Sequence, residues 1–218
     1  MTTNDAATNN TVTNNTAAKS KKLNTKMIAQ IGMLAAIAVV LMLFEIPLPF
    51  APSFYEIDFS EVPVLIGAFT MGPLAGGIIE LVKIILNLCI NGTVTAGVGE
   101  FANFVIGCAL VLPAAIIYKR KKTKKGAMIG LVTGTLFMTF AGCFINAYIM
   151  LPTYAKAFGM PIDALVEMGS AVNASITDLF TFVMFAVVPF NLLKGVLVSI
   201  IVLLIYKKIS PILKMNMQ

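Results

Sequence analysis

Residues 188–195 read Val-Pro-Phe-Asn-Leu-Leu-Lys-Gly and lie inside an apolar run that covers residues 180–206. At a helical rise of about 1.5 Å per residue, this run is long enough to cross a lipid bilayer. Asn191 and Lys194 are three residues apart and therefore share one helix face, where an amide and a lysine are costly unless they serve a function. Pro189 interrupts the backbone hydrogen-bond ladder just before them. The segment predicts a membrane helix that forms one wall of a binding site.

A purely structural role for Lys194 is the alternative. It could pair with a carboxylate such as Glu100 and do no more than lock two helices together. An ion pair alone gives no reason for Asn191 to lie on the same face, so the pattern favours the binding site.

The composition is that of a polytopic membrane protein. Of the 218 residues, 58% are hydrophobic and only 12% are charged, about half the charged fraction of a typical soluble domain. The net charge of +6 comes from basic clusters beside apolar segments, which indicates topology rather than nucleic-acid binding. The chain contains no histidine, which argues against most general-base, triad and zinc chemistries. We therefore expect no catalytic residue, no metal site and no cofactor.

Six apolar segments predict an all-α integral membrane protein with a bundle of six transmembrane helices. Their ranges are 27–44, 62–71, 74–90, 98–118, 127–151 and 180–206. The second segment is short, about half a bilayer in helical length, and Pro152 is expected to end the fifth. A short amphipathic helix is expected at residues 160–168, over the outer mouth.

Basic residues place both termini on one side of the membrane. Lysines precede the first span and follow the last, and residues 119–125 hold six lysine or arginine side chains between the fourth and fifth spans. With six spans, these three clusters lie together in the cytoplasm of a multi-pass cell-membrane protein. We expect a disordered polar and basic tail at 1–26, a membrane domain at 27–208 and a cytoplasmic tail at 209–218.

Amides recur on the polar faces of the predicted spans and indicate the ligand class. The inward residues expected at the site are Asn87, Asn103, Asn146, Asn191 and Lys194. Amides donate and accept hydrogen bonds without carrying charge, so they suit an uncharged heterocycle or polyol. A strongly anionic ligand would call for more arginine.

Two further segments have expected roles. Residues 45–61, which we call the lid loop, combine prolines with aromatic residues among carboxylates. Their rings could cover a flat ligand, or they could form an interfacial aromatic belt. Gly32 and Ala36 form a pair of small residues four apart, which either packs inside the bundle or, if it points outward, docks another membrane subunit.

Several motifs, in order, resemble the riboflavin-specific S components of energy-coupling factor (ECF) transporters. The resemblance covers about residues 27–208, and the Pro-Phe-Asn-x-x-Lys-Gly element is its most telling part. The motifs are 57–63 (IDFSEVP), 66–69 (IGAF), 72–76 (GPLAG), 99–104 (GEFANF), 146–154 (NAYIMLPTY) and 189–195 (PFNLLKG).

This resemblance implies a six-helix subunit that captures riboflavin from outside with high affinity. The subunit would work with an ECF module of two ATPases and one transmembrane coupling protein. The implied flavin-ring contacts are Asn146, Asn191 and Lys194. The implied ribityl contacts are Glu100 and Asn103, with Phe59 covering the ring and Gly32 and Ala36 docking the coupling protein.

Other functions remain open on the residues alone. An S component could instead bind thiamine, folate, pantothenate or flavin mononucleotide. A structural membrane subunit without a ligand would use the inward amides only to hold helices together. An intramembrane enzyme would use Glu80, Glu100 or Asp178, but no nucleophile lies beside a base.

Overall fold

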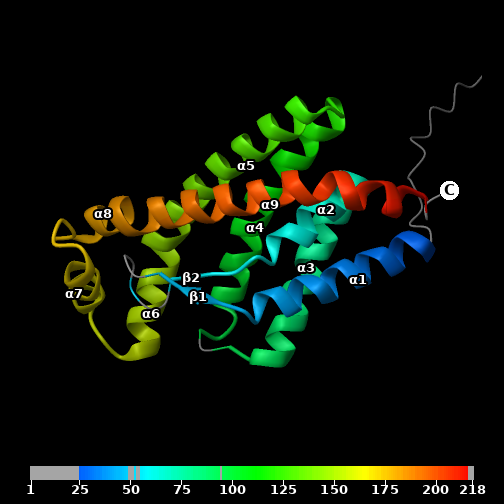
Figure 1. Cartoon of the computed structure of the whole chain (residues 1–218). Helices are drawn as coiled ribbons and strands as arrows, with labels where there is room; N and C mark the ends of the chain where they lie inside the picture. Colours follow the sequence, from blue (N-terminus) through cyan, green and yellow to red (C-terminus); the bar gives the residue numbers. More distant parts are fainter. Residues whose placement is uncertain (1–24, 49–51, 53–54, 94, 216–218) are drawn as a thin grey trace, which may run out of the picture.

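The computed structural model describes residues 25–48, 52, 55–93 and 95–215, and it is nearly all helical (Figure 1). Its elements are α1 (Thr25–Met42), β1 (Ile46–Pro47), β2 (Glu56–Ile57), α2 (Glu61–Met71), α3 (Pro73–Asn91), α4 (Val98–Arg120), α5 (Lys124–Ile145), η1 (Asn146–Met150), α6 (Leu151–Phe158), α7 (Ile162–Val172), α8 (Leu179–Phe182), η2 (Val183–Val187) and α9 (Val188–Met215). The described ends of α1 and α9 lie at the same end of the molecule (Figure 1).

Five helical segments within the described residues are long and apolar enough to cross a membrane. They are Thr25–Met42, Pro73–Asn91, Val98–Arg120, Lys124–Phe158 and Leu179–Tyr206, and they coincide with five of the six predicted spans. The other predicted span is α2, which has 11 residues. The count of six membrane-crossing helices and the cytoplasmic location of the termini stay predictions.

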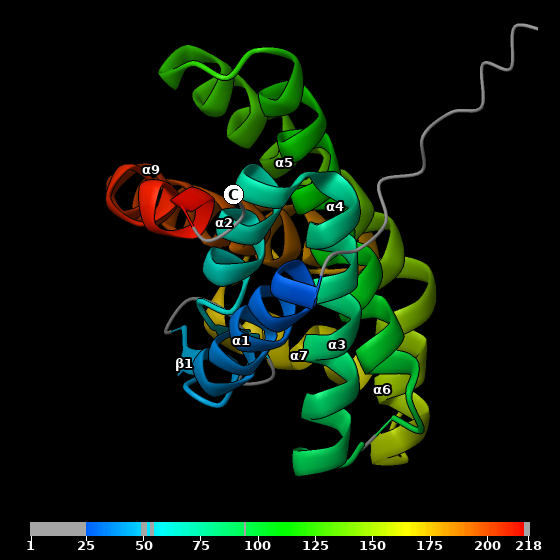
Figure 2. The same ribbon diagram turned by 90° about the vertical axis from the view of Figure 1, so that its right-hand side faces the viewer.

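The short helix α2 lies at the centre of the bundle. It contacts α1, α3, α4 and α9, and Figure 2 shows it enclosed among these helices. Nine of its 11 residues are buried. Because protein rather than lipid surrounds it, α2 need not be as long as the bilayer is thick. Polar backbone groups at its ends are also not exposed to lipid.

Both long helices around the site continue through a proline. The expectation that Pro152 ends the fifth span is wrong, because the helix runs on to Phe158. A wide π-helical turn precedes Pro152, and a second one, η2, precedes Pro189 in the same way. The ring of a helical proline clashes with the carbonyl four residues earlier, and in both helices that carbonyl lies inside the π turn. The wider turn thus accommodates the proline without ending the helix.

Glycines of α5 allow this helix to pack closely against α4. A side chain at Gly130 would collide with the carbonyl oxygen of Ala114, and one at Gly134 with that of Leu110. The two glycines are four residues apart and so lie on one face of α5, which lets the backbones of α4 and α5 approach each other. This pair of glycines was not among the predicted packing motifs, although its spacing is visible in the sequence.

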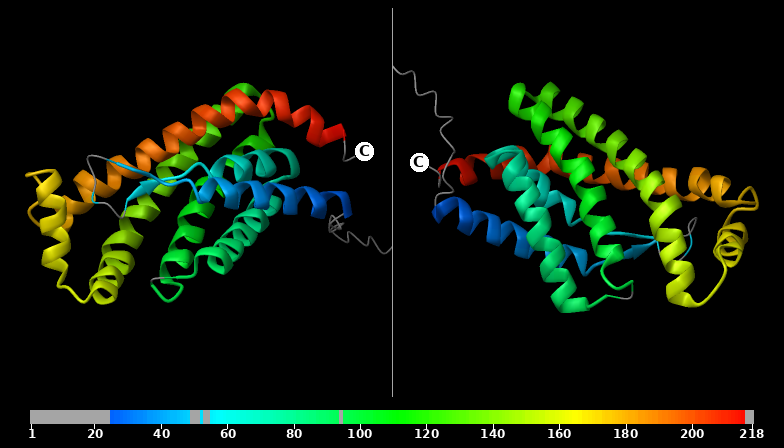
Figure 3. Two further views of the ribbon diagram at one scale, coloured as in Figure 1. Left: turned by 60° about the horizontal axis from the view of Figure 1, so that its bottom comes forward. Right: turned by 180° about the vertical axis from the view of Figure 1, so that it is seen from behind.

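Helices α6, α7 and α8 lie at the end of the molecule opposite the described termini (Figure 3). A helix is confirmed at most of the expected residues 160–168, as α7 (Ile162–Val172), which buries Leu165 and Val166. Its expected place over the outer mouth stays a prediction. The Leu165 and Val166 side chains belong to a second core together with Ile176, Phe182 and others from α6, α8 and η2. The antiparallel strands β1 and β2 pair within the lid loop.

Only part of the two predicted tails lies within the described residues. Residues 1–24 lie outside the described residues, as do 216–218 and the lid-loop residues 49–51 and 53–54. Helix α9 continues to Met215 and so includes most of the predicted tail at 209–218.

Candidate ligand-binding site

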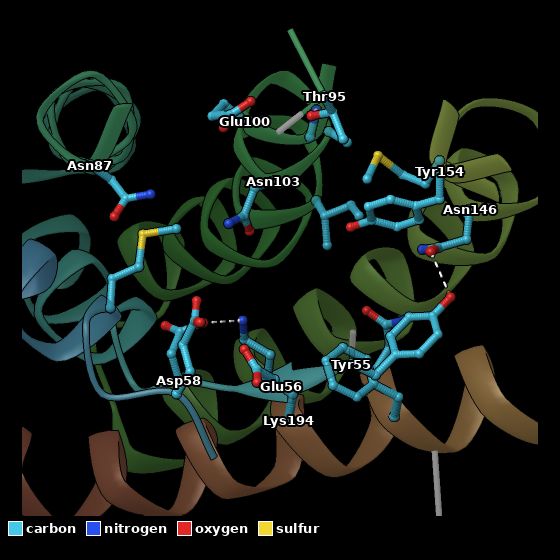
Figure 4. Close-up of a pocket in the computed structure, with 18 of the residues that line it drawn as sticks. Tyr55, Glu56, Asp58, Asn87, Thr95, Glu100, Asn103, Asn146, Tyr154 and Lys194 are labelled. Atoms are coloured by element: carbon cyan, nitrogen blue, oxygen red, sulfur yellow. Dashed lines mark hydrogen bonds and ion pairs between the residues drawn. The ribbon is translucent and has the colours of Figure 1, made fainter. Parts of the chain in front are cut away.

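A cavity of about 470 Å³ opens where the lid loop meets α3, α4, η1, α6 and α9 (Figure 4). This volume lies in the range of about 300–1,000 Å³ that is usual for small-molecule sites. Of the six ligand contacts expected from the sequence, five line the cavity: Glu100, Asn103, Asn146, Asn191 and Lys194. Figure 4 shows Glu100 and Asn103 on α4, across the open centre of the cavity from Lys194.

Asn146 begins the π turn η1 and is held by two hydrogen bonds. Its Nδ2 donates to the carbonyl oxygen of Gly142 at 2.8 Å, and its Oδ1 accepts from the Tyr55 hydroxyl at 2.8 Å. Burial, followed by the proximity of Tyr154 and Cys143, raises the pKa of Tyr55 well above its ordinary value. The phenol therefore stays protonated and donates to the amide, which fixes the orientation of Asn146 at the cavity wall.

Asn191 follows the second π turn and is seated against a glycine. Its Nδ2 donates to the carbonyl oxygen of Val187 at 2.9 Å. A Cβ atom at Gly142 would lie only 2.8 Å from Asn191 Nδ2 and 2.9 Å from its Oδ1. The missing side chain on α5 thus makes the space that the Asn191 amide occupies, and α5 and η2 together set its position.

Lys194 pairs with Asp58 of the lid loop rather than with Glu100. Its Nζ lies 2.8 Å from Asp58 Oδ2, while Glu100 accepts from the Thr93 hydroxyl at 3.0 Å. Burial alone would raise the pKa of Asp58, but the ammonium groups of Lys194 and Lys83 outweigh it and hold that pKa well below its usual range. Asp58 is therefore ionised, and the pair ties α9 to the lid loop.

A second buried lysine continues this network away from the cavity. The backbone N–H of Ser60 donates to Asp58 Oδ1 at 2.8 Å, and Lys83 Nζ donates to Ser60 Oγ at 3.2 Å. Lys83 Nζ also lies 2.8 Å from Glu61 Oε1 and 2.8 Å from Glu80 Oε1. Glu80 and Lys83, three residues apart on α3, thus form an internal ion pair, and Glu61 joins them in what we call the Lys83 cluster.

The structure places Phe59 elsewhere than expected. Its ring is half-buried and packs against the main hydrophobic core, and it is not among the cavity-lining residues. Tyr55, from the same loop, lines the cavity instead, with its ring centroid 5.1 Å from that of Phe190. Tyr154 and Phe190 also line it. Tyr154 lies in the motif at 146–154 and Phe190 in the motif at 189–195, so both could have been predicted as cavity residues from these motifs.

Gly32 and Ala36 lie away from the cavity. Both are exposed on α1, and a Cβ atom at Gly32 would meet nothing within 4 Å. Packing inside the bundle therefore does not account for this pair. It forms part of an outward face on which a partner helix could approach closely.

Comparison with known proteins agrees with this architecture. The family model "ECF transporter, substrate-specific component" matches residues 26–206. A protein named riboflavin transporter RibU from Staphylococcus aureus is 36% identical over 89% of this chain and 97% of its own length. Riboflavin transporter FmnP from Bacillus subtilis is 34% identical over 87% of this chain and 94% of its own. A solved S component of a bacterial ECF transporter matches with a TM-score of 0.67 and 35% identity, over 87% of this chain and 98% of that one. The chain belongs to the substrate-specific components of ECF transporters.

Proposed function

We propose that this protein is the high-affinity riboflavin-binding subunit of an ECF transporter. The observation that carries this proposal is the convergence of Asn146, Asn191 and Lys194 on one cavity. These three groups come from two helices and all face the same open space, in a chain whose relatives are named riboflavin transporters.

The chemistry of the cavity fits the two parts of riboflavin. The pyrimidine edge of the flavin presents an N–H between two carbonyls, which amides and an ammonium can pair. Tyr154 and Phe190 supply aromatic surface for the ring. Glu100 and Asn103 on α4 provide polar groups for the ribityl hydroxyls.

Transport requires a partner that supplies energy. In this proposal the cavity opens to the outside, both termini lie in the cytoplasm, and two ATPases act through a transmembrane coupling protein. Riboflavin enters and leaves unchanged, so no residue acts as a catalyst and no cofactor takes part. The outward pair Gly32 and Ala36 on α1 is the docking face for the coupling protein.

The ligand is tested by the visible absorption spectrum of protein purified in detergent from cells grown with riboflavin. A flavin band near stoichiometry that survives washing is the expected result. Colourless protein that also fails to quench the fluorescence of added riboflavin would contradict the proposal. Thiamine, folate and pantothenate would then be the ligands to titrate.

Docking is tested separately by Gly32→Leu. This change should leave riboflavin binding intact and abolish uptake by cells, because it fills the face on which a partner helix approaches. Val132→Leu, at an exposed apolar position on α5, is the matched control and should affect neither. Loss of binding together with uptake in Gly32→Leu would contradict the docking role.

A further inference from the structure

The cavity is acidic although the chain is basic. The protein carries a net charge of +6, yet the ionisable carboxylates and amines that line the cavity are Glu45, Glu56, Asp58, Glu100 and Lys194. Four carboxylates against one ammonium give a charge of −3 when all five are ionised. The positive charge of the sequence therefore says nothing about the potential that a ligand meets.

The charge of the single ammonium is already compensated within the protein. Lys194 Nζ lies 2.8 Å from Asp58 Oδ2, so these two charges largely cancel. Within the described part of the chain, Glu45, Glu56 and Glu100 take part in no ion pair. The three carboxyl groups without an ion-pair partner therefore determine the electrostatic potential in the cavity.

Glu45 and Glu56 lie close together where the two strands of the lid loop pair. Partial burial, a hydrogen bond to Glu56 and repulsion from its charge raise the pKa of Glu45 to about 7. At neutral pH Glu45 is therefore only partly ionised. The Glu100 carboxyl group lies on the opposite wall, on α4.

One feature of the cavity could favour an anion, namely the N-terminus of α4. Its first N–H groups are already used: those of Val98 and Gly99 donate to the carbonyl and hydroxyl oxygens of Thr95, at 3.2 and 2.8 Å. The Glu100 side chain also lies in this first turn. The helix end is therefore satisfied from within the protein and offers little to a phosphate.

We propose that Glu45, Glu56 and Glu100 form a charge filter that admits the uncharged vitamin and rejects anionic ligands such as its 5′-phosphate. This inference rests on the proposed function, since it assumes a flavin in this cavity. A phosphate would bring up to two negative charges beside three unpaired carboxylates, with no free lysine or arginine among the lining residues to offset them. The filter acts on charge, and therefore differs from exclusion by size.

The test compares three ligands by quenching of flavin fluorescence: riboflavin, riboflavin 5′-phosphate and an uncharged riboflavin 5′-acetate. We expect the phosphate to bind at least about tenfold more weakly than riboflavin and the acetate to bind much closer to riboflavin. Raising the salt concentration should narrow the gap between riboflavin and the phosphate. Equal rejection of acetate and phosphate would overturn the filter.

Substitutions assign the effect to residues. Glu45→Gln, Glu56→Gln and Glu100→Gln should each lower the ratio of the two dissociation constants, phosphate over riboflavin, by about threefold or more. Glu167→Gln, an exposed position on α7 outside the cavity, is the matched control and should leave the ratio unchanged. If riboflavin binds but the ratio stays constant in all three variants, the filter is wrong and the proposed function stands. If riboflavin does not bind at all, the proposed function fails and the filter fails with it.

Discussion

Two buried lysines in this molecule have opposite surroundings. Lys83 on α3 is 0% exposed, and its ammonium contacts Glu61, Glu80 and the Ser60 hydroxyl. Lys194 on α9 is 9% exposed, lines the cavity and has one carboxylate partner, Asp58. An ammonium has three hydrogens to donate. Lys83 donates to Ser60 and Glu61 and also pairs with Glu80, all inside the bundle, whereas the ammonium of Lys194 donates to Asp58 and faces the cavity.

The difference leads us to assign Lys83 to the packing of the bundle and to propose Lys194 as a ligand contact. The Lys83 cluster joins α2 to α3, and none of its three side chains lines the cavity, so its ion pairs hold the centre of the bundle together. Lys194 lies beside the Asn191 amide and faces open space. We therefore expect loss of Lys83 to act on stability and loss of Lys194 to act on ligand binding.

The largest effect should come from Lys83→Met. It leaves two carboxylates buried without their cation, which typically costs about 3–5 kcal/mol of unfolding free energy. Chemical unfolding in detergent micelles measures this cost, and Lys156→Met, at an exposed position on α6, is the control. Adding Glu80→Gln should restore part of the loss, because it removes one of the stranded charges. A loss below about 1 kcal/mol would contradict the structural role.

Lys194→Ala should show the reverse pattern. Riboflavin binding should weaken by about 1–3 kcal/mol, because a ligand acceptor loses its partner, and Asn191→Ala should have an effect of the same size. The unfolding free energy should fall less than in Lys83→Met, since Asp58 lies at a cavity that water reaches. Fluorescence titration of purified variants measures the affinity. Unchanged affinity in both would show that the site is assigned wrongly.

The sequence distinguishes these lysines only through their neighbours. Glu80 three residues before Lys83 indicates an internal ion pair, and Asn191 three residues before Lys194 indicates a site. The ion pair is present in the structure, and Asn191 and Lys194 both line the cavity, while their binding role stays a prediction. Asp58 could not be predicted as the partner of Lys194, because the two are 136 residues apart and meet only in the folded chain.

The errors also have physical reasons. Phe59 and Tyr55 stand in one loop, and the direction of each side chain depends on the strand pairing of β1 with β2, which the turn sequence does not reveal. Pro152 ordinarily ends a helix, and only the π turn of η1 lets this one continue. The short length of α2 was predicted from the sequence, but its place among four other helices depends on packing between segments far apart in the chain.

Gly142→Ala tests the surroundings of Lys194 and leaves Lys194 itself unchanged, because it acts on the neighbouring Asn191 amide. The added methyl group would displace the Asn191 amide, and flavin binding should weaken by about 1–2 kcal/mol as one hydrogen bond is lost. Gly77→Ala is the matched control on α3, because there the new Cβ would lie an ordinary 3.7 Å from Leu112. If both variants bind riboflavin equally well, Gly142 does not position Asn191.

The smallest expected effect is that of pH on ligand release. It should separate the Lys194–Asp58 pair from Glu45 and Glu56, which lie at the mouth of the cavity. The lowered pKa of Asp58 means that its pair with Lys194 persists from neutral pH downward until the pH falls below the usual range of a carboxyl group. The pKa of Glu45 is instead raised to about 7 by burial and by Glu56. Its protonated form is the one that the folded lid loop favours, so that contribution is full in acid and is lost as the pH rises through 7.

Release of bound riboflavin should therefore quicken modestly between pH 6 and pH 8, by about two- to threefold, as Glu45 and Glu56 come to repel each other across the strand pair. Stopped-flow displacement measures this rate. Glu45→Gln should abolish the pH dependence, whereas Asp163→Asn on α7 should preserve it. A pH profile that survives in Glu45→Gln would place the titrating group elsewhere. Because Lys194 and Asp58 keep their charges throughout this range, the ligand contacts and the mouth of the cavity can be varied independently.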